Sequence, residues 1–139
     1  MRIFVLDDDM ERIKWFKKHW ENVYYSHNPI EAEKMLKANE YDVVNLDADL
    51  GGAYQRGPLG DGIDLAKVMA KDELHVDVPT IVHSMNYPAS ENIISMLKPT
   101  HKNLFRIDFF TLRKMNAEQV AYITEHKLKP FYRGEQNEA

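Results

Sequence analysis

Aspartates follow two short, mainly apolar segments of the sequence at the point where each segment stops. Asp7, Asp8 and Asp9 come after the first segment, and Asp47 is the first residue after the second. Carboxylate oxygens are the ligands that Mg²⁺ and similar hard divalent cations prefer. Carboxylates that lie close together repel one another unless a cation or solvent screens them. These residue types therefore favour a site for a divalent cation such as Mg²⁺ or Mn²⁺.

A simpler role is open to the first group of aspartates, because negative charge near the N-terminus of a helix is favourable. One aspartate would suffice to cap a helix that begins after this segment. Three in a row, together with Asp47 at the end of another segment, favour a metal site with Asp7, Asp8 and Asp47 as ligands.

A second polar group, His83, Ser84 and Asn86, follows a later apolar segment. Histidine can shuttle a proton near neutral pH, whereas Ser84, Asn86 and Arg106 could orient phosphate oxygens. A lone histidine on an apolar strand is more often a packed or capping group than a catalyst. Strand alternation also points His83 away from Ser84, unless the backbone turns there. Both roles of His83 therefore stay open.

Short apolar runs alternate with helical patterns along the chain,. The strands that we expect span residues 2–6, 23–26, 42–46, 78–83 and 104–107. Helices are expected from residues 10, 29, 61, 89 and 117, and residues 51–62 are expected to form a glycine-rich loop. The apolar positions that mark the first helix are Met10, Ile13, Phe16 and Trp20. Five such β-α units predict an α/β fold with three layers, a doubly wound parallel sheet between helices. Ligands bind such folds at the carboxyl ends of the strands, where both polar groups fall.

The chain's 139 residues fit one domain, which we expect to span residues 1–128, followed by a polar tail at 129–139,. The net charge of −4 gives no support for sequence-specific DNA binding through an overall basic field,. Cysteine is absent, which excludes disulfides and zinc sites built on sulfur,. No apolar run approaches the length of a membrane span. We expect a cytoplasmic protein without a membrane partner.

Four motifs resemble the receiver domains of two-component signalling, and they occur in the same order. They are Ile3-Phe4-Val5-Leu6-Asp7-Asp8, Val43-Val44-Asn45-Leu46-Asp47, Asp61-Gly62, and Ser84 at the end of the fourth strand. The resemblance implies a five-stranded, flavodoxin-like fold. It further implies that Asp7 and Asp8 bind Mg²⁺ directly or through water and that Asp47 is both ligand and phospho-acceptor. The backbone carbonyl of Asp49 would complete the coordination, and Ser84 would hydrogen-bond a phosphoryl oxygen.

One residue of the receiver pattern is missing, because receivers place a lysine at the end of the fifth strand to pair with the phosphate. Lys98-Pro99 comes only fourteen residues after Ser84, too few for a helix and a strand, so we assign it to the end of the fourth helix. The expected place falls near Arg106, which could substitute as the cation.

Three segments are similar to a divergent group, the cyclic-phosphate processing receiver domains. They are Asp7-Asp8-Asp9, Leu46-Asp47-Ala48-Asp49-Leu50-Gly51-Gly52 and His83-Ser84-Met85-Asn86. Membership implies the handling of a cyclic phosphate on a nucleotide or an RNA end. The residues expected to act in catalysis are then Asp47, His83 and Ser84, with Ser84, Asn86 and Arg106 binding the phosphate.

Three other interpretations stay open. The chain could be a stand-alone response regulator, phosphorylated on Asp47 and recognised by a protein partner. It could also be a degenerate binding module that keeps the fold and lacks chemistry. Asp47-Ala48-Asp49 also suggests a haloacid-dehalogenase-type phosphatase. That family carries the pair on its first strand, with a later lysine and a further acidic pair, and neither that position nor those partners is found here.

Overall fold

The computed structural model describes residues 1–48, 50 and 62–126. Within these residues the strands are β1 (Ile3–Leu6), β2 (Val23–Ser26), β3 (Val43–Leu46), β4 (Thr80–Val82) and β5 (Leu104–Arg106). The helices are α1 (Met10–His19), α2 (Pro29–Ala38), α3 (Gly62–Lys71), α4 (Tyr87–Leu97), α5 (Phe109–Leu112) and α6 (Ala117–His126). The predicted loop falls almost entirely on residues 51–61, which lie outside the described residues.

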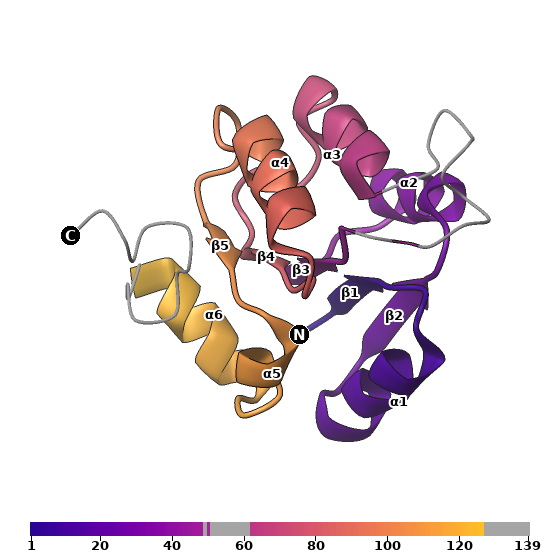
Figure 1. Cartoon of the computed structure of the whole chain (residues 1–139), viewed down its shortest axis with the longest axis vertical. Helices are drawn as coiled ribbons and strands as arrows, with labels where there is room; N and C mark the ends of the chain where they lie inside the picture. The colour runs from indigo at the N-terminus through magenta and orange to yellow at the C-terminus, as the bar shows by residue number, and fades with distance from the viewer. Residues whose placement is uncertain (49, 51–61, 127–139) are drawn as a thin grey trace.

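The five strands form one parallel sheet in the order β2-β1-β3-β4-β5. Helices α2, α3 and α4 cover one face of this sheet, and α1, α5 and α6 cover the other (Figure 1). This arrangement confirms the three-layer, doubly wound, flavodoxin-like fold. The register pairs Leu6 with Leu46, and Leu46 with Val82, so β1, β3 and β4 end level with one another. Whatever follows these three strands is therefore brought to one edge.

Alternate residues of the strands enter two separate cores. Phe4 and Leu6 of β1 pack with the residues of α2, α3 and α4, whereas Ile3 and Val5 pack on the opposite face with Phe16 of α1. Burial on both faces explains why the strands are almost continuously apolar. The same alternation decides that Asp7, two residues after Val5, lies on the α1 side of the sheet.

The helix boundaries follow from side-chain capping. The carboxylate of Asp9 accepts hydrogen bonds from backbone N–H groups of α1, and Asn28 caps α2 ahead of a proline,. Asn86 caps α4, which begins at Tyr87, two residues before the predicted start. Helix α5 was not predicted. Its only sequence signal is Asp108, whose carboxylate accepts from the backbone N–H of Thr111 at 2.9 Å.

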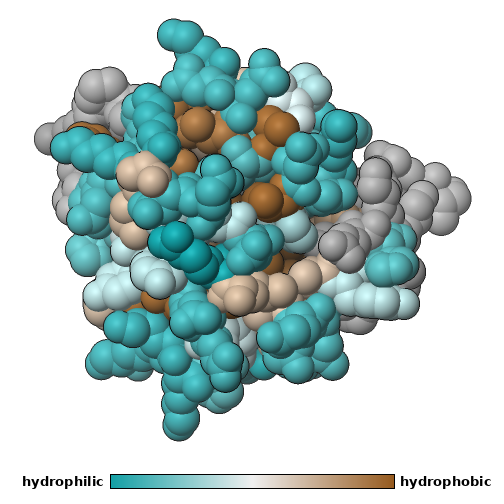
Figure 2. Space-filling view, turned by 180° about the vertical axis from the view of Figure 1, so that it is seen from behind, coloured by the Kyte–Doolittle hydropathy of each residue, from teal (hydrophilic) through white to brown (hydrophobic). Residues whose placement is uncertain are grey.

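The apolar stripe of α1 differs from the prediction at one position. Ile13, Phe16 and Trp20 are buried as expected, but Met10 is 44 % exposed. Met10 is the first residue of the helix, directly after its cap Asp9. Most of the face seen in Figure 2 is hydrophilic, with apolar atoms gathered between polar side chains in its upper half.

The assignment of residues 1–128 to one domain stays a prediction, and the predicted tail at 129–139 lies outside the described residues. None of the helices described here is both long enough and apolar enough to cross a membrane.

Candidate metal and phosphate site

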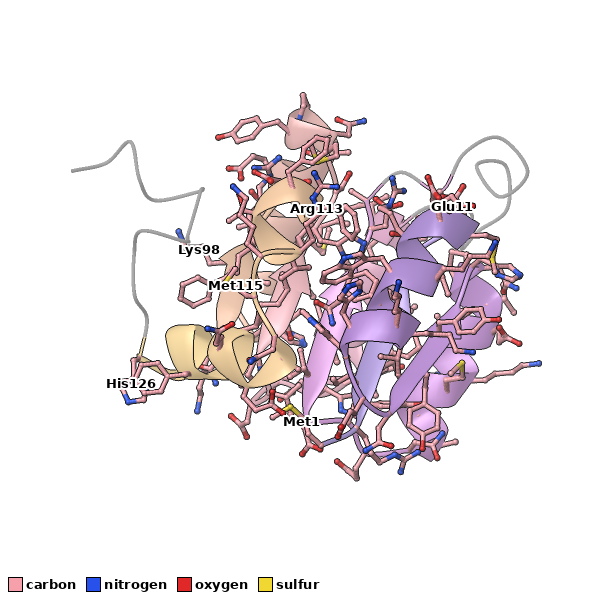
Figure 3. The ribbon with its side chains drawn as sticks, turned by 90° about the horizontal axis from the view of Figure 1, so that it is seen from below. Met1, Glu11, Lys98, Arg113, Met115 and His126 are labelled. Atoms are coloured by element: carbon pink, nitrogen blue, oxygen red, sulfur yellow. The ribbon has the colours of Figure 1, made fainter. Side chains whose placement is uncertain are left out.

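Three carboxylates meet where β1 and β3 end. Each of Asp7, Asp8 and Asp47 offers one oxygen, and these oxygens all lie within 4.8 Å of one another. The parallel pairing of Leu6 with Leu46 causes this convergence, because the next residue on each strand is an aspartate. Asp7 is fully buried and Asp47 is 2 % exposed, whereas Asp8 is accessible to solvent. The sequence predicted that these carboxylates meet, and their role as metal ligands stays a prediction. In Figure 3, Glu11 of the first turn of α1 and Met1 lie toward opposite ends of the molecule.

The donor set fits a hard divalent cation. Mg²⁺ takes oxygen ligands at about 2.0–2.1 Å in an octahedron, so neighbouring ligand oxygens are about 3 Å apart and opposite ones about 4 Å. Oxygens within 4.8 Å of one another need only a small inward movement to reach this geometry. The accessible Asp8 leaves a side from which the cation and a phosphate can approach. Asp49, whose backbone carbonyl the receiver resemblance adds to the ligands, lies outside the described residues.

The carboxylate of Asp7 accepts four hydrogen bonds. Oδ1 accepts from Arg12 Nη2 at 2.9 Å and from the backbone N–H of Asp9 at 2.9 Å. Oδ2 lies 2.8 Å from Arg12 Nε and 2.8 Å from His83 Nε2. An ionised carboxylate has about four lone-pair sites, so this one is saturated.

Two opposed influences act on the pKa of Asp7. Burial alone would raise it, but the hydrogen bond and charge of His83, the hydrogen bonds of Arg12 and the backbone N–H of Asp9 outweigh burial. The pKa of this carboxyl therefore lies well below its usual range, and Asp7 is ionised at neutral pH.

Arg12 is a component of the site that the sequence analysis missed. Besides its two bonds to Asp7, its Nη2 lies 3.3 Å from Asp47 Oδ2, and its Nη1 lies 3.4 Å from Asp9 Oδ2. Burial would lower the pKa of Arg12. The hydrogen bond to Asp7 and the charges of Asp7, Asp47 and Asp9 outweigh burial and raise this pKa above its ordinary value. A signal was present. Side chains of a helix lean toward its N-terminus, so an arginine in the first turn after an acidic strand end reaches back to the carboxylates.

His83 lies on the α1 side of the sheet, as strand alternation predicts, and away from Ser84. Its side chain is fully buried, with its ring 5.4 Å from that of Phe16, centroid to centroid. Nε2 faces Asp7, and Nδ1 has no hydrogen-bond partner among the described residues. In this position His83 orients Asp7 rather than facing an open cleft.

Ser84 and Asn86 lie on the other side of the sheet edge, where α4 begins. Ser84 Oγ accepts a hydrogen bond from the backbone N–H of Asn86 at 3.0 Å, and Asn86 Oδ1 accepts from that of Ala89 at 3.1 Å. Asn86 is exposed, while Ser84 is 3 % exposed. These contacts use both side chains as acceptors, so the Ser84 hydroxyl proton and the Asn86 amide group are the groups with which they can donate to an anion.

Arg106 is the last residue of β5 and is 5 % exposed. Its Nη2 donates to the backbone carbonyl of Ser84 at 3.3 Å, and its guanidinium lies 4.7 Å from the ring centre of Tyr87. The arginine is thus placed at the start of α4, on the same side as Ser84. Lys98 is the residue at which α4 ends, as predicted, and it does not take the place of the receiver lysine.

Gly62, the first residue of α3, allows a close approach to the acidic strand end. A Cβ atom at this position would lie 2.3 Å from the carbonyl oxygen of Asp47 and 3.0 Å from Cα of Ala48. Both atoms belong to the backbone and cannot move aside independently. Only glycine therefore lets α3 begin this close to Asp47.

A family model described as "Cyclic-phosphate processing Receiver domain" matches residues 1–99. The chain belongs to this family. The resemblance seen in the sequence is thereby confirmed for the family, and the chain is a receiver domain of response-regulator type. The search among curated proteins found no match.

Solved receiver domains share the fold of this cyclic-phosphate processing receiver domain. The Francisella response regulator 1452 receiver domain has 22 % identity and a TM-score of 0.59, over 91 % of this chain and 98 % of that one. The receiver domain of NtrX from Brucella abortus has 17 % identity and a TM-score of 0.56, over 92 % and 98 %. TrrA from Thermotoga maritima, in complex with Mg²⁺-BeF, has 19 % identity and a TM-score of 0.54, over 94 % and 97 %. At these identities the likeness shows the fold alone.

Proposed function

We propose that this domain is a metal-dependent site for a phosphate ester and that its substrate is a cyclic phosphate of a nucleotide or an RNA end. The observation that carries the proposal is the meeting of three carboxylate oxygens within 4.8 Å at the sheet edge where Ser84 and the start of α4 also lie. Membership of a family described as processing cyclic phosphates supports this choice of substrate.

Asp8 and Asp47 would hold the cation. Asp7 would contribute through water once Arg12 Nη2, which donates to both Asp7 and Asp47, has withdrawn and left one lone pair of Asp7 open,. When bound, such a cation polarises a phosphodiester and lowers the pKa of an attacking water. Ser84 and Asn86 donate hydrogen bonds to the phosphate oxygens, and Arg106 supplies positive charge from the end of β5. In hydrolysis the water oxygen bonds to phosphorus, one ring P–O bond breaks, and the released ribose oxygen takes a proton of that water, which leaves a phosphate monoester.

For His83 we propose a positioning role, acting through Asp7, in place of the direct catalytic role predicted from the sequence. Its Nε2 is 2.8 Å from Asp7, and the ring is fully buried against Phe16. Through this contact His83 fixes the rotamer of Asp7, and with it the carboxylate that faces the cation. His83→Ala should therefore weaken Mg²⁺ binding as well as turnover, whereas loss of a proton shuttle alone would reduce turnover only.

A second candidate is a response regulator that is phosphorylated on Asp47 and recognised by a protein partner. The shared fold favours it, and TrrA carries Mg²⁺-BeF in its solved complex. Against it stands the end of β5, where Arg106, Ile107 and Asp108 follow one another and receivers carry a lysine.

One pair of assays separates the candidates. Wild type, Asp47→Asn and Ser84→Ala are incubated with Mg²⁺ and either a 2′,3′-cyclic nucleotide or acetyl phosphate, with Lys14→Ala as a control outside the site. Mg²⁺-dependent hydrolysis that both site variants lose supports the proposal. Labelling by acetyl phosphate that only Asp47→Asn loses, without hydrolysis, supports the response regulator. If wild type shows neither hydrolysis nor labelling, the interpretation as a binding module without chemistry is favoured.

A further inference from the structure

Arg12 satisfies the carboxylates of the site with the protein's own charge. Its Nε and Nη2 donate to the two oxygens of Asp7 at 2.8 and 2.9 Å, in the paired geometry that suits a guanidinium and a carboxylate,. The same Nη2 lies 3.3 Å from Asp47 Oδ2. One guanidinium thus bridges two of the three carboxylates that form the cation site.

A divalent cation and this guanidinium need the same oxygens. Asp7 has no lone pair left for a metal while Arg12 and His83 are in place,. Asp47 is nearly buried and lies 3.3 Å from Arg12 Nη2, so a cation that reaches Asp47 also comes close to the charge of Arg12. A divalent cation and a guanidinium that contact the same carboxylates repel each other strongly in a partly buried site.

Arg12 also has a path out of the site. Its side chain is 26 % exposed, and Nη1 already lies 3.4 Å from Oδ2 of Asp9, whose own side chain is 42 % exposed. Asp9 caps α1, and its carboxylate can bind the guanidinium at the solvent-exposed side of the site. Release from Asp47 can therefore occur while the guanidinium stays paired with the carboxylate of Asp9.

We propose that Arg12 is an internal cation that competes with the divalent cation for Asp47 and Asp7. It neutralises the carboxylates when no metal is bound and sets the metal concentration at which the site fills. This inference deepens the proposed function, because it concerns regulation of the same site.

The test is Mg²⁺ titration by isothermal titration calorimetry of wild type, Arg12→Ala and Arg12→Gln. Both variants remove the charge, and Gln keeps a hydrogen-bond donor for Asp7. They should bind Mg²⁺ about tenfold more tightly than wild type, because a neighbouring unit charge is removed. Lys14→Ala is the matched control, since Lys14 is on the same helix and its ion pair is with the exposed Glu11, at 3.7 Å. This control should stay within about twofold of wild type.

Thermal unfolding gives a second, independent result. In EDTA the Arg12 variants should melt below wild type, because the carboxylates repel one another without a counter-charge. Saturating Mg²⁺ should raise their Tm by more than it raises that of wild type, as tighter binding requires. A variant that does not fold without metal should fold when Mg²⁺ is added, and failure to do so overturns the inference.

The outcomes distinguish this inference from the proposed function. If only the Arg12 variants bind Mg²⁺, the inference is supported and the proposed metal-dependent function of the wild-type protein is contradicted. Equal or weaker binding by the variants overturns the inference and leaves the proposed function standing. No Mg²⁺ binding by any of the proteins overturns both.

Discussion

The polar side chains on the two sides of the sheet edge differ in how many of their hydrogen-bonding groups already have partners within the protein. On the α1 side, the buried Asp7 and His83 form a network with the partly exposed Arg12, and together with the backbone N–H of Asp9 they fill every acceptor site of the Asp7 carboxylate. On the α4 side, Ser84 and Asn86 mainly accept bonds from their own backbone and keep donors to offer. This difference fits the proposed function, in which the α1 side would fix the carboxylates and the α4 side would bind the anion. Substitutions on the two sides should therefore fail in different ways.

Asp7→Asn should have the largest effect on stability, on the order of 3 kcal/mol, because it removes a buried charge that Arg12 and His83 both use,. The measurement is the free energy of unfolding in urea. Asp9→Asn is the matched control, since asparagine caps a helix as well as aspartate does,. A loss as large in Asp9→Asn would show that general helix charge, and not the network, supplies the stability.

The pH dependence of stability should carry the signature of Asp7. Its pKa is lowered in the folded protein, so its contribution is complete above the unfolded value of about 4 and is lost as the pH falls toward the folded value,. The stability difference between wild type and Asp7→Asn should shrink as the pH falls below about 4. A difference that grows as the pH falls would contradict this sign.

Gly62→Ala tests whether the acidic strand end needs the close approach of α3. The added Cβ would meet the Asp47 carbonyl at 2.3 Å, so backbone must move, at about 2 kcal/mol,. We expect weaker Mg²⁺ binding alongside the lower stability, measured by calorimetry and urea unfolding. Ala70→Gly, a residue of the same helix away from Asp47, should lower stability without changing Mg²⁺ binding,.

Ser84→Ala should have the smallest effect on stability and a selective effect on the anion. It removes one acceptor for the N–H of Asn86, worth about 1 kcal/mol or less,. Binding of beryllofluoride in the presence of Mg²⁺ should weaken about tenfold, because a donor to a charged group is lost, while Mg²⁺ binding alone stays unchanged. If Mg²⁺ binding fell equally, the two sides of the edge would not be separable.

Much of this architecture could be predicted from the sequence, because it depends on local patterns. The apolar runs that end on Asp7 and Asp47 predicted both the parallel sheet and the meeting of these carboxylates. The part that the sequence analysis missed depends on directions in space. The reach of Arg12 follows from the tilt of helical side chains, which residue types alone do not display.

Two other elements show the same limit. Helix α5, of only four residues, lacks the length over which helical spacing can be recognised,. For His83 strand alternation predicted the side of the sheet but left two roles open, and the sequence did not show that its ring is fully buried against Phe16 with Nε2 facing Asp7.

The most direct test of the central claim is anomalous diffraction from a crystal soaked in millimolar Mn²⁺, which stands in for Mg²⁺. We expect a single strong anomalous peak between the side-chain oxygens of Asp8 and Asp47, with Asp7 connected to it through water and Arg12 Nη2 withdrawn from both Asp7 and Asp47. The absence of a peak between Asp8 and Asp47, with Arg12 still bridging Asp7 and Asp47, would contradict the account.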